Sequence, residues 1–487
     1  MKIFIKLISA VLLLSMMLIP LSSCGGTEEE LTDTEAVTTT DPEESYQYFP
    51  EGVDFGGKEY HILNCEREQW EYIAMFTSHE YLGQAINDAF YSRTAWIEDT
   101  LNCKLVENNI PMDQVMPELD SKLNAGEDLY AGAFVQVGGI YGNAMTKVLQ
   151  GQLYELDSVE AMHLDENYYV KYMMDAMSVG KKHYTAASSN QLAYFEGSWH
   201  IFFDVGILTD AQVDLPYDYV RNGTWTLETM AQMARQVMTT GEAGNYDFDP
   251  YGSAKYGITG GIDALFYGIG GIYATKDAED FPMLNVETTG FVDRVQAIAA
   301  IVAEEGLYLD NDYTNPDKHT NKLLTNRRVA FTSGEIFQLK LTIEAGVDVG
   351  IVPLPKYNED QERYMPFANI NGNYFVIPIT NSKPEEIRLI YDAMAWEADK
   401  TFEKVYYVDH LELKMNSGEM EDDVEMLQII RESMSGDAGL LSGTVADLKK
   451  AVNGSMLNGG HTVASDIATS KKSVNALLTA IKATLDK

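Results

Sequence analysis

The side chains that most often perform catalysis or bind metal ions form no recognised motif in this sequence. None of the eight histidines occurs as His-x-His or His-Glu-x-x-His, the spacings that bring two imidazoles to one metal ion. The chain also lacks the Gly-x-Ser-x-Gly nucleophile elbow and the Gly-x-x-x-x-Gly-Lys phosphate loop. Gly268, Gly270 and Gly271 do not complete Gly-x-Gly-x-x-Gly, because Tyr273 occupies the third position. The sequence therefore carries no signature of metal hydrolysis, of a serine nucleophile or of a nucleotide site.

Carboxylates are the only abundant side chains in this sequence that commonly take part in catalysis. Two of the 74 acidic residues could face each other across a cleft as in a glycosidase, although abundant acids usually form a solvated surface. Asn245, Asp247 and Asp249 resemble the start of a calcium loop, but Pro250 stands where that loop needs glycine and Tyr256 where it needs glutamate. We expect no catalytic residue, no metal and no cofactor, and a carboxylate-pair glycan hydrolase is the alternative enzyme class.

Length and charge narrow the class of protein. The 487 residues, 45% of them apolar, can form two or three domains around a large core. With 35 basic and 74 acidic residues, the net charge is −39. A chain this acidic is repelled by phosphate backbones and by anionic membrane surfaces, so nucleic acid is excluded as an expected partner.

The N-terminus has the features of a secretory address. Lys2 and Lys6 precede an apolar run from Leu7 to Ile19, which is too short to cross a bilayer of about 30 Å as a helix. The run ends at Leu21-Ser22-Ser23-Cys24, which resembles the bacterial lipobox. We expect residues 1–23 to be a lipoprotein signal peptide and Cys24 to carry the lipid, palmitate included. The alternative is an ordinary secretory signal with a nearby cysteine.

The segment after Cys24 is expected to be a tether. Residues 25–47 contain eight acids, six threonines and no base, so they cannot bury enough apolar surface to fold. We assign residues 24–52 to this acidic tether. Two cysteines then remain, Cys65 and Cys103, which could close a 39-residue disulfide loop or stay as two buried thiols.

The folded part alternates strands with amphipathic helices. This order indicates βαβ units, a mostly parallel sheet, and ligand binding beyond the carboxyl ends of the strands. Gly138 to Tyr141, directly after a strand, is therefore a candidate binding loop. Strands are predicted at 59–63, 104–107, 132–137, 347–352 and 374–377, and helices at 84–101, 113–124, 291–305 and 384–398, from Thr226 onward and at the C-terminus.

Several segments, in their order and spacing, resemble the sugar-type family 1 solute-binding proteins of ABC importers, the group that includes the maltose-binding proteins. The resemblance covers most of the chain after the tether. The segments are Asp54-Phe55-Gly56-Gly57-Lys58-Glu59-Tyr60, Gln84-Ala85-Ile86-Asn87-Asp88-Ala89-Phe90, Leu123 to Tyr130, Thr224-Trp225-Thr226-Leu227-Glu228, Val329 to Gly334, Val349 to Pro355 and Asn381-Ser382-Lys383-Pro384.

The resemblance implies an α/β fold of the type II periplasmic-binding-protein class, with two hinge-linked lobes around a central cleft. Lobe 1 is expected at 53–190 plus 372–412, and lobe 2 at 191–371 plus 413–487. The chain would cross between lobes near 186–194, near 368–374 and near residue 412. Trp225 matches the family's helix-start motif and is expected to be structural.

The resemblance also implies a function. We expect a monomeric, lipid-anchored protein on the outer face of a Gram-positive cytoplasmic membrane. This protein would capture a carbohydrate, with an oligosaccharide as the favoured class, and deliver it to an ABC permease. Sugars need aromatic platforms and planar polar groups. The alternative ligands are peptides or cationic solutes, which would suit an acidic cleft. The residues expected to contact the ligand are Trp70, Tyr141, Glu196, Trp199, Asp263, Tyr267, Glu335, Asn371 and Asn373.

Overall fold

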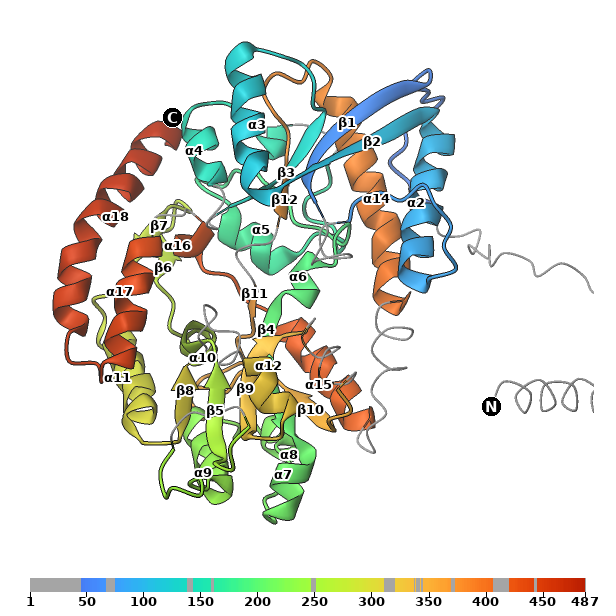
Figure 1. The fold of residues 1–487 in the computed structure, drawn as a ribbon. Helices are drawn as coiled ribbons and strands as arrows, with labels where there is room; N and C mark the ends of the chain where they lie inside the picture. Colours follow the sequence, from blue (N-terminus) through green and yellow to red (C-terminus); the bar gives the residue numbers. More distant parts are fainter. Residues whose placement is uncertain are drawn as a thin grey trace, which may run out of the picture. The chain divides into compact units, whose positions relative to one another are not determined.

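Two β-sheets organise the folded part of the chain (Figure 1). The computed structural model describes residues 45–66, 75–137, 143–158, 162–246, 251–310, 320–336, 338, 342, 345–368, 373–405, 420–441 and 445–486, and Tyr46 to Lys487 form one unit. Cys24, Trp70, Tyr141 and Asn371 lie outside the described residues, as do Gly138, Gly139 and residues 247–250 of the calcium-like loop.

The first sheet has the strand order β12-β3-β1-β2. Its strands are β1 (Lys58–Cys65), β2 (Cys103–Ile110), β3 (Gly132–Gln136) and β12 (Asn373–Val376). β1 pairs in parallel with both β2 and β3, whereas β12 pairs antiparallel with β3. The mostly parallel sheet expected from the sequence is confirmed for β1, β2 and β3. The sheet is mixed because β12, which comes from a distant part of the chain, adds one antiparallel strand.

Helices α2 (Ala85–Leu101) and α14 (Pro384–Lys404) pack against each other and on this sheet, and α3 (Met112–Ala125) packs on β1 and β3 (Figure 1). In α2 the apolar residues recur at helical spacing, and Phe90, Ile97 and Leu101 are fully buried. Pro384 begins α14, where a missing N–H leaves no helical hydrogen bond unmade. We call this sheet and these helices lobe 1.

The second sheet has the order β10-β4-β9-β5-β8, with β11 paired to β4. Its strands are β4 (Ser198–Asp204), β5 (Tyr256–Gly260), β8 (Tyr308–Asp310), β9 (Val329–Glu335), β10 (Val349–Val352) and β11 (Phe367–Ala368). β5, β8 and β9 are parallel, and β4 runs antiparallel to β9 and β10. We call this sheet and its helices lobe 2.

The predicted helix after Thr226 is confirmed as α9 (Leu227–Val237). The Thr226 hydroxyl accepts a hydrogen bond from the Thr229 N–H, which is the capping expected from the sequence. Trp225 is fully buried and donates its indole N–H to the Pro353 carbonyl at 2.8 Å, as expected of a structural residue.

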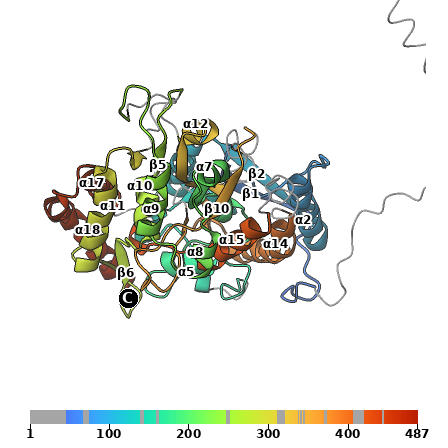
Figure 2. The same ribbon diagram turned by 90° about the horizontal axis from the view of Figure 1, so that it is seen from below.

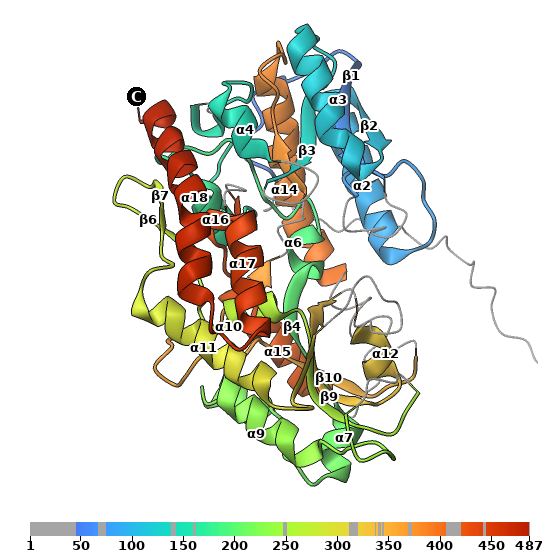
Figure 3. The same cartoon turned by 60° about the vertical axis from the view of Figure 1, so that its left-hand side comes forward.

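Other short elements complete the fold. In Figures 2 and 3, α11, α17 and α18 lie side by side, and α17 contacts both of the others. The remaining bounds are α4 (Ala144–Leu149), η1 (Leu156–Ser158), α5 (Lys171–Met177), α6 (Ala193–Glu196), α7 (Val205–Asp210), α8 (Tyr217–Arg221), α10 (Ile262–Gly268), β6 (Ala274–Lys276), β7 (Pro282–Leu284), α11 (Thr289–Ala303), α12 (Thr320–Thr325), α15 (Met420–Ser433), α16 (Ala438–Leu441), α17 (Ala446–Leu457) and α18 (Val463–Leu485).

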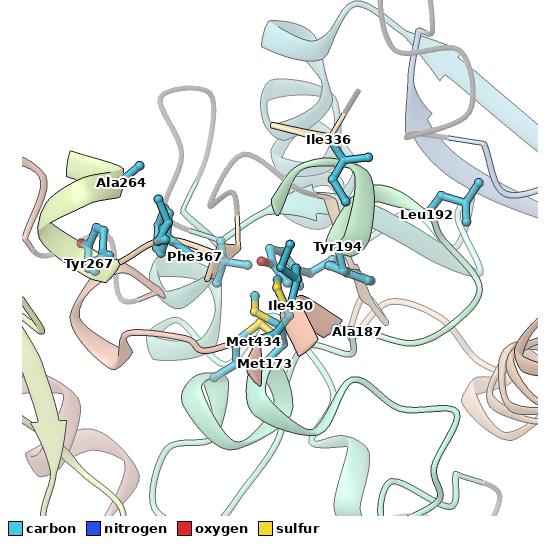
Figure 4. Packing of buried hydrophobic residues seen from close by; sticks show 14 of the residues in the cluster. Met173, Ala187, Leu192, Tyr194, Ala264, Tyr267, Ile336, Phe367, Ile430 and Met434 are labelled. Atoms are coloured by element: carbon cyan, nitrogen blue, oxygen red, sulfur yellow. The ribbon is translucent and has the colours of Figure 1, made fainter. Parts of the chain in front are cut away.

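Two of the predicted crossing segments lie side by side. Ala186 pairs with Phe375 in an antiparallel bridge, and the Tyr194 hydroxyl donates to the Asn373 carbonyl at 3.0 Å. Buried apolar residues from both lobes, including Met173, Tyr194, Phe367 and Met434, belong to one hydrophobic cluster (Figure 4). The strands of each sheet fall within the lobe ranges given above, whose boundaries stay a prediction.

The start of the folded unit is tied to helix α14 through one carboxylate. Asp392 is fully buried and accepts hydrogen bonds from the hydroxyls of Tyr46, Tyr168 and Tyr169 at 2.6, 2.9 and 2.7 Å. The His163 N–H donates to the same carboxylate at 2.9 Å. These four hydrogen bonds to one buried charge are complete only when the chain from Tyr46 onward is in place.

The disulfide weighed from the sequence is not formed. Cys65 and Cys103 are both free and buried. β1 and β2 pair in parallel register, with Cys103 opposite Lys58 and Cys65 opposite Ile110, so the two thiols lie at opposite ends of the strand pair. Seven residues of extended strand separate them, far beyond the reach of a disulfide. No helix of the described ranges has the length and apolarity that crossing a bilayer requires.

Candidate functional site

Strand direction brings four of the predicted ligand residues to one edge of the second sheet. The parallel strands β5, β8 and β9 end at this edge, and the antiparallel β4 begins there. Trp199 on β4 is therefore the direct cross-strand partner of Glu335 at the end of β9. Asp263 follows the end of β5, and Glu196 precedes β4. We call Glu196, Trp199, Asp263 and Glu335 the Trp199 site.

The half-buried indole of Trp199 lies against a glycine that leaves room for it. A Cβ atom at Gly261 would come within 3.0 Å of the indole Cζ3 and of the Asp263 Oδ1. Gly260, with a φ of +124°, lets β5 approach β9 so closely that a Cβ there would lie 2.1 Å from the Ser333 Oγ. The Gly260-Gly261 pair thus holds the aromatic ring and the Asp263 carboxylate next to each other.

The negative charge of the Asp263 carboxylate is paired with a lysine that the sequence analysis did not predict. The Lys449 Nζ lies 2.5 Å from the Asp263 Oδ2, and both side chains are mostly buried. Lys449 is on α17, 186 positions along the chain from Asp263, so no local pattern in the sequence indicates that the two side chains meet. The ion pair fixes the carboxylate and leaves its Oδ1 beside the indole edge and the Ala264 N–H.

The two glutamates of the site are buried, with Glu196 and Glu335 each 5% exposed. The Glu335 N–H donates to the Gln338 Oε1 at 3.3 Å, which joins the end of β9 to the helical turn after it. Buried carboxylates beside an aromatic ring can accept hydrogen bonds from the hydroxyls of a bound molecule while the ring covers its C–H face.

Tyr267 does not join this group. It is 1% exposed, and its ring stacks on Phe367 with centroids 4.1 Å apart and an interplanar angle of 6°. Burial raises the pKa of its hydroxyl well above the usual value. In this structure the ring is part of the hydrophobic cluster between the lobes rather than an open surface (Figure 4).

Asn373 lies on the other sheet, at the amino end of β12. Because β12 is antiparallel to β3, this residue is at the edge where β1 and β3 end. Its Nδ2 donates to the Cys65 Sγ at 2.9 Å, and it is 6% exposed. The described structure therefore holds Asn373 at the strand edge of lobe 1 and the Trp199 site at that of lobe 2.

The site presents an aromatic ring and carboxylate oxygens. In the described ranges no three His, Cys, Asp or Glu side chains are grouped so as to hold a metal ion. His200, beside the site on β4, is fully buried with its Nε2 2.8 Å from the Ser198 Oγ, and burial lowers its pKa to about 3. A neutral, buried imidazole of this kind supports the strand and is not poised for proton transfer near pH 7.

Neither a protein-family model nor a curated protein sequence matches this chain. Solved structures do match its fold. The cyclic α-maltosyl-1,6-maltose binding protein from Arthrobacter globiformis is similar at 9% identity and a TM-score of 0.58, over 87% of this chain and 99% of the other.

Two further solved structures are similar to this chain in fold. A cyclo/maltodextrin-binding protein complexed with maltotetraose is 13% identical, with a TM-score of 0.54 over 88% of this chain and 97% of the other. An ABC substrate-binding protein from Listeria monocytogenes, in complex with cycloalternan, is 13% identical, with a TM-score of 0.52 over 88% and 99%. With its two mixed sheets and its paired crossing segments, the chain has the two-lobed α/β fold of the substrate-binding proteins of ABC importers.

Proposed function

We propose that this protein captures an oligosaccharide between its two lobes and delivers it to an ABC permease. The observation that carries the proposal is the Trp199 site, where an indole and three carboxylates lie at the ligand-binding edge of a substrate-binding fold. The similar structures are of proteins that bind cycloalternan, maltotetraose and cyclic α-maltosyl-1,6-maltose, and such sugars fit an aromatic ring flanked by hydrogen-bond acceptors.

Binding should depend on Trp199 and not on exposed aromatic residues elsewhere. The test is calorimetry and thermal shift of the chain without residues 1–24, against maltodextrins, cyclic glucans, oligopeptides and polyamines. A ligand at 100 times its dissociation constant should stabilise the fold by about 2.7 kcal/mol. Trp199→Ala should weaken oligosaccharide binding at least tenfold, and Tyr251→Ala, which changes a 77% exposed ring, should leave it unchanged.

The outcomes separate the ligand classes. Stabilisation by peptides or polyamines alone would keep the fold and overturn the carbohydrate assignment. Hydrolysis of a glycan, abolished by Glu335→Gln or Asp263→Asn, would replace the receptor by the carboxylate-pair hydrolase.

The proposal includes a lipid anchor at Cys24 on the outer face of the cytoplasmic membrane. Its support is the sequence Leu21-Ser22-Ser23-Cys24 and the acidic tether that follows. In an expressing Gram-positive cell, labelled palmitate should enter the wild-type protein and not Cys24→Ser, and the variant should be released into the medium. If the wild-type protein is itself released without lipid, the lipid anchor is wrong and residues 1–23 are an ordinary secretory signal.

A further inference from the structure

A second cavity lies away from the Trp199 site, at the place where the chain crosses between the lobes. Its volume is about 300 Å³, and it shares no residue with the Trp199 site. Its walls come from residues 167–172, from the crossing segment 188–194, and from the ends of α14 and α15. We call it the hinge cavity. Its inner wall is mostly apolar and is formed by Tyr169, Leu192, Tyr194, Ala398, Phe402 and Met434, all of them buried.

The size and lining of the hinge cavity suit a small molecule with an aromatic body. An enclosed apolar cavity of about 150 Å³ is enough to hold benzene. Twice that volume accommodates a phenyl ring with a short chain. Tyr194 and Met434 also belong to the hydrophobic cluster that joins the lobes, so the cavity floor is part of the buried, packed core (Figure 4).

One polar group on the inner wall has no partner. Gln191 is 4% exposed, and its Oε1 lies 3.3 Å from the Tyr194 hydroxyl, whose one proton is shared between this oxygen and the nearer Asn373 carbonyl at 3.0 Å. Its Nε2 has no hydrogen-bond partner within the described residues. An unpaired buried amide N–H costs about 1–3 kcal/mol, and an acceptor atom on an occupant would remove that cost.

The mouth of the cavity is basic, which is exceptional in a chain of net charge −39. Lys171 and Arg431 line it and are both exposed, and Asp399 is the only acid among the lining residues. The Lys171 Nζ also lies 3.4 Å from the Asp175 Oδ1 at the surface, outside the lining. The Asp399 carboxylate accepts the Ser189 hydroxyl at 2.9 Å, so part of its charge is already engaged. Two cations beside an apolar cavity favour an anion with an apolar body.

We propose that the hinge cavity is a second binding site, which takes a small aromatic carboxylate with its ring among Tyr194, Phe402 and Met434. The carboxylate lies toward Lys171 and Arg431, and Gln191 donates to one of its oxygens or to a polar atom of the chain between. This site is independent of the sugar ligand proposed for the Trp199 site.

The test uses 3-phenylpropionate as the probe and its neutral amide as the comparison, with the chain lacking residues 1–24, by calorimetry at low salt. Saturable binding with one site is expected, and the amide should bind about three- to tenfold more weakly. Arg431→Gln should weaken binding of the carboxylate about three- to tenfold. Arg363→Gln, an exposed arginine outside the cavity, should not change it.

Gln191 provides the sharper pair of variants. Gln191→Glu keeps the shape and replaces the donor by a charge that repels the probe, so binding should fall more than tenfold. Gln191→Met removes the unpaired donor, so it should weaken binding while leaving the melting temperature unchanged or higher. If Gln191→Glu does not fold, Gln191→Met and Arg431→Gln decide the question.

Three results would contradict the proposal of a binding site in the hinge cavity. These are an absence of saturable binding of 3-phenylpropionate, binding that survives both Gln191→Met and Arg431→Gln, and binding that is lost in Trp199→Ala. The last result would place the probe in the cleft. A failure to find any oligosaccharide ligand would not affect this outcome, so the two proposals fail separately.

Discussion

The Nζ atom of Lys449 lies 2.5 Å from the Oδ2 atom of Asp263, which joins α17 to the first turn of α10. The pair ties the C-terminal helices to the candidate binding edge of lobe 2. Because both side chains are mostly buried, removing one charge leaves the other poorly solvated.

Lys449→Gln should therefore destabilise the protein by about 1–2 kcal/mol, measured as a lower midpoint of urea unfolding at pH 7. Lys450→Gln is the matched control, since Lys450 is the next residue and is exposed. Equal midpoints for Lys449→Gln and the control would show that the ion pair contributes nothing to the fold.

The Tyr46 hydroxyl marks where the folded unit begins. It donates at 2.6 Å to the buried carboxylate of Asp392, and a hydrogen bond to a charged group is worth about 1.5–3 kcal/mol. Tyr46→Phe should lower the free energy of unfolding by about that amount. Tyr251→Phe, at a 77% exposed position, should not. An unchanged stability in Tyr46→Phe would mean that the folded part starts later in the chain.

His200 should make the protein sensitive to mild acid. Burial lowers its pKa to about 3, whereas an unfolded histidine has a pKa of about 6.5. Between these values the unfolded chain binds a proton that the folded chain does not, so stability falls as the pH falls, by up to about 1.4 kcal/mol per unit.

The comparison of wild type with His200→Gln isolates this effect. Urea unfolding from pH 7 to pH 5 should show a steeper loss of stability in the wild type, with the difference approaching one proton per molecule. Parallel curves for the two proteins would indicate that His200 is accessible to protons in the folded state.

The two free thiols should be detectable only after unfolding. Cys65 and Cys103 are buried, and burial raises the pKa of the Cys103 thiol to about 12, so almost no thiolate exists at pH 8. The chain without residues 1–24, never exposed to reductant, should react with two equivalents of a thiol reagent in 6 M guanidinium and with almost none when folded. Zero equivalents in denaturant would mean that the cysteines had paired.

The sequence by itself determined the elements that depend on local periodicity and capping. The apolar spacing in 85–101, the Thr226 cap and Pro384 each fix a helix through contacts within a few residues, and the structure confirms all three helices. The βαβ order likewise gives the parallel pairing of β1, β2 and β3.

Only the tertiary structure decided what surrounds each candidate residue. Trp199 and Glu335 become neighbours through strand pairing across 136 positions, whereas Tyr267, chosen by the same reasoning, is covered by Phe367. Lys449 and Gln191 gave no local signal, because an ion pair or an unpaired donor depends on long-range packing. Local patterns set the secondary structure, but partners distant in the chain set burial and charge, and these decide which side chains can bind.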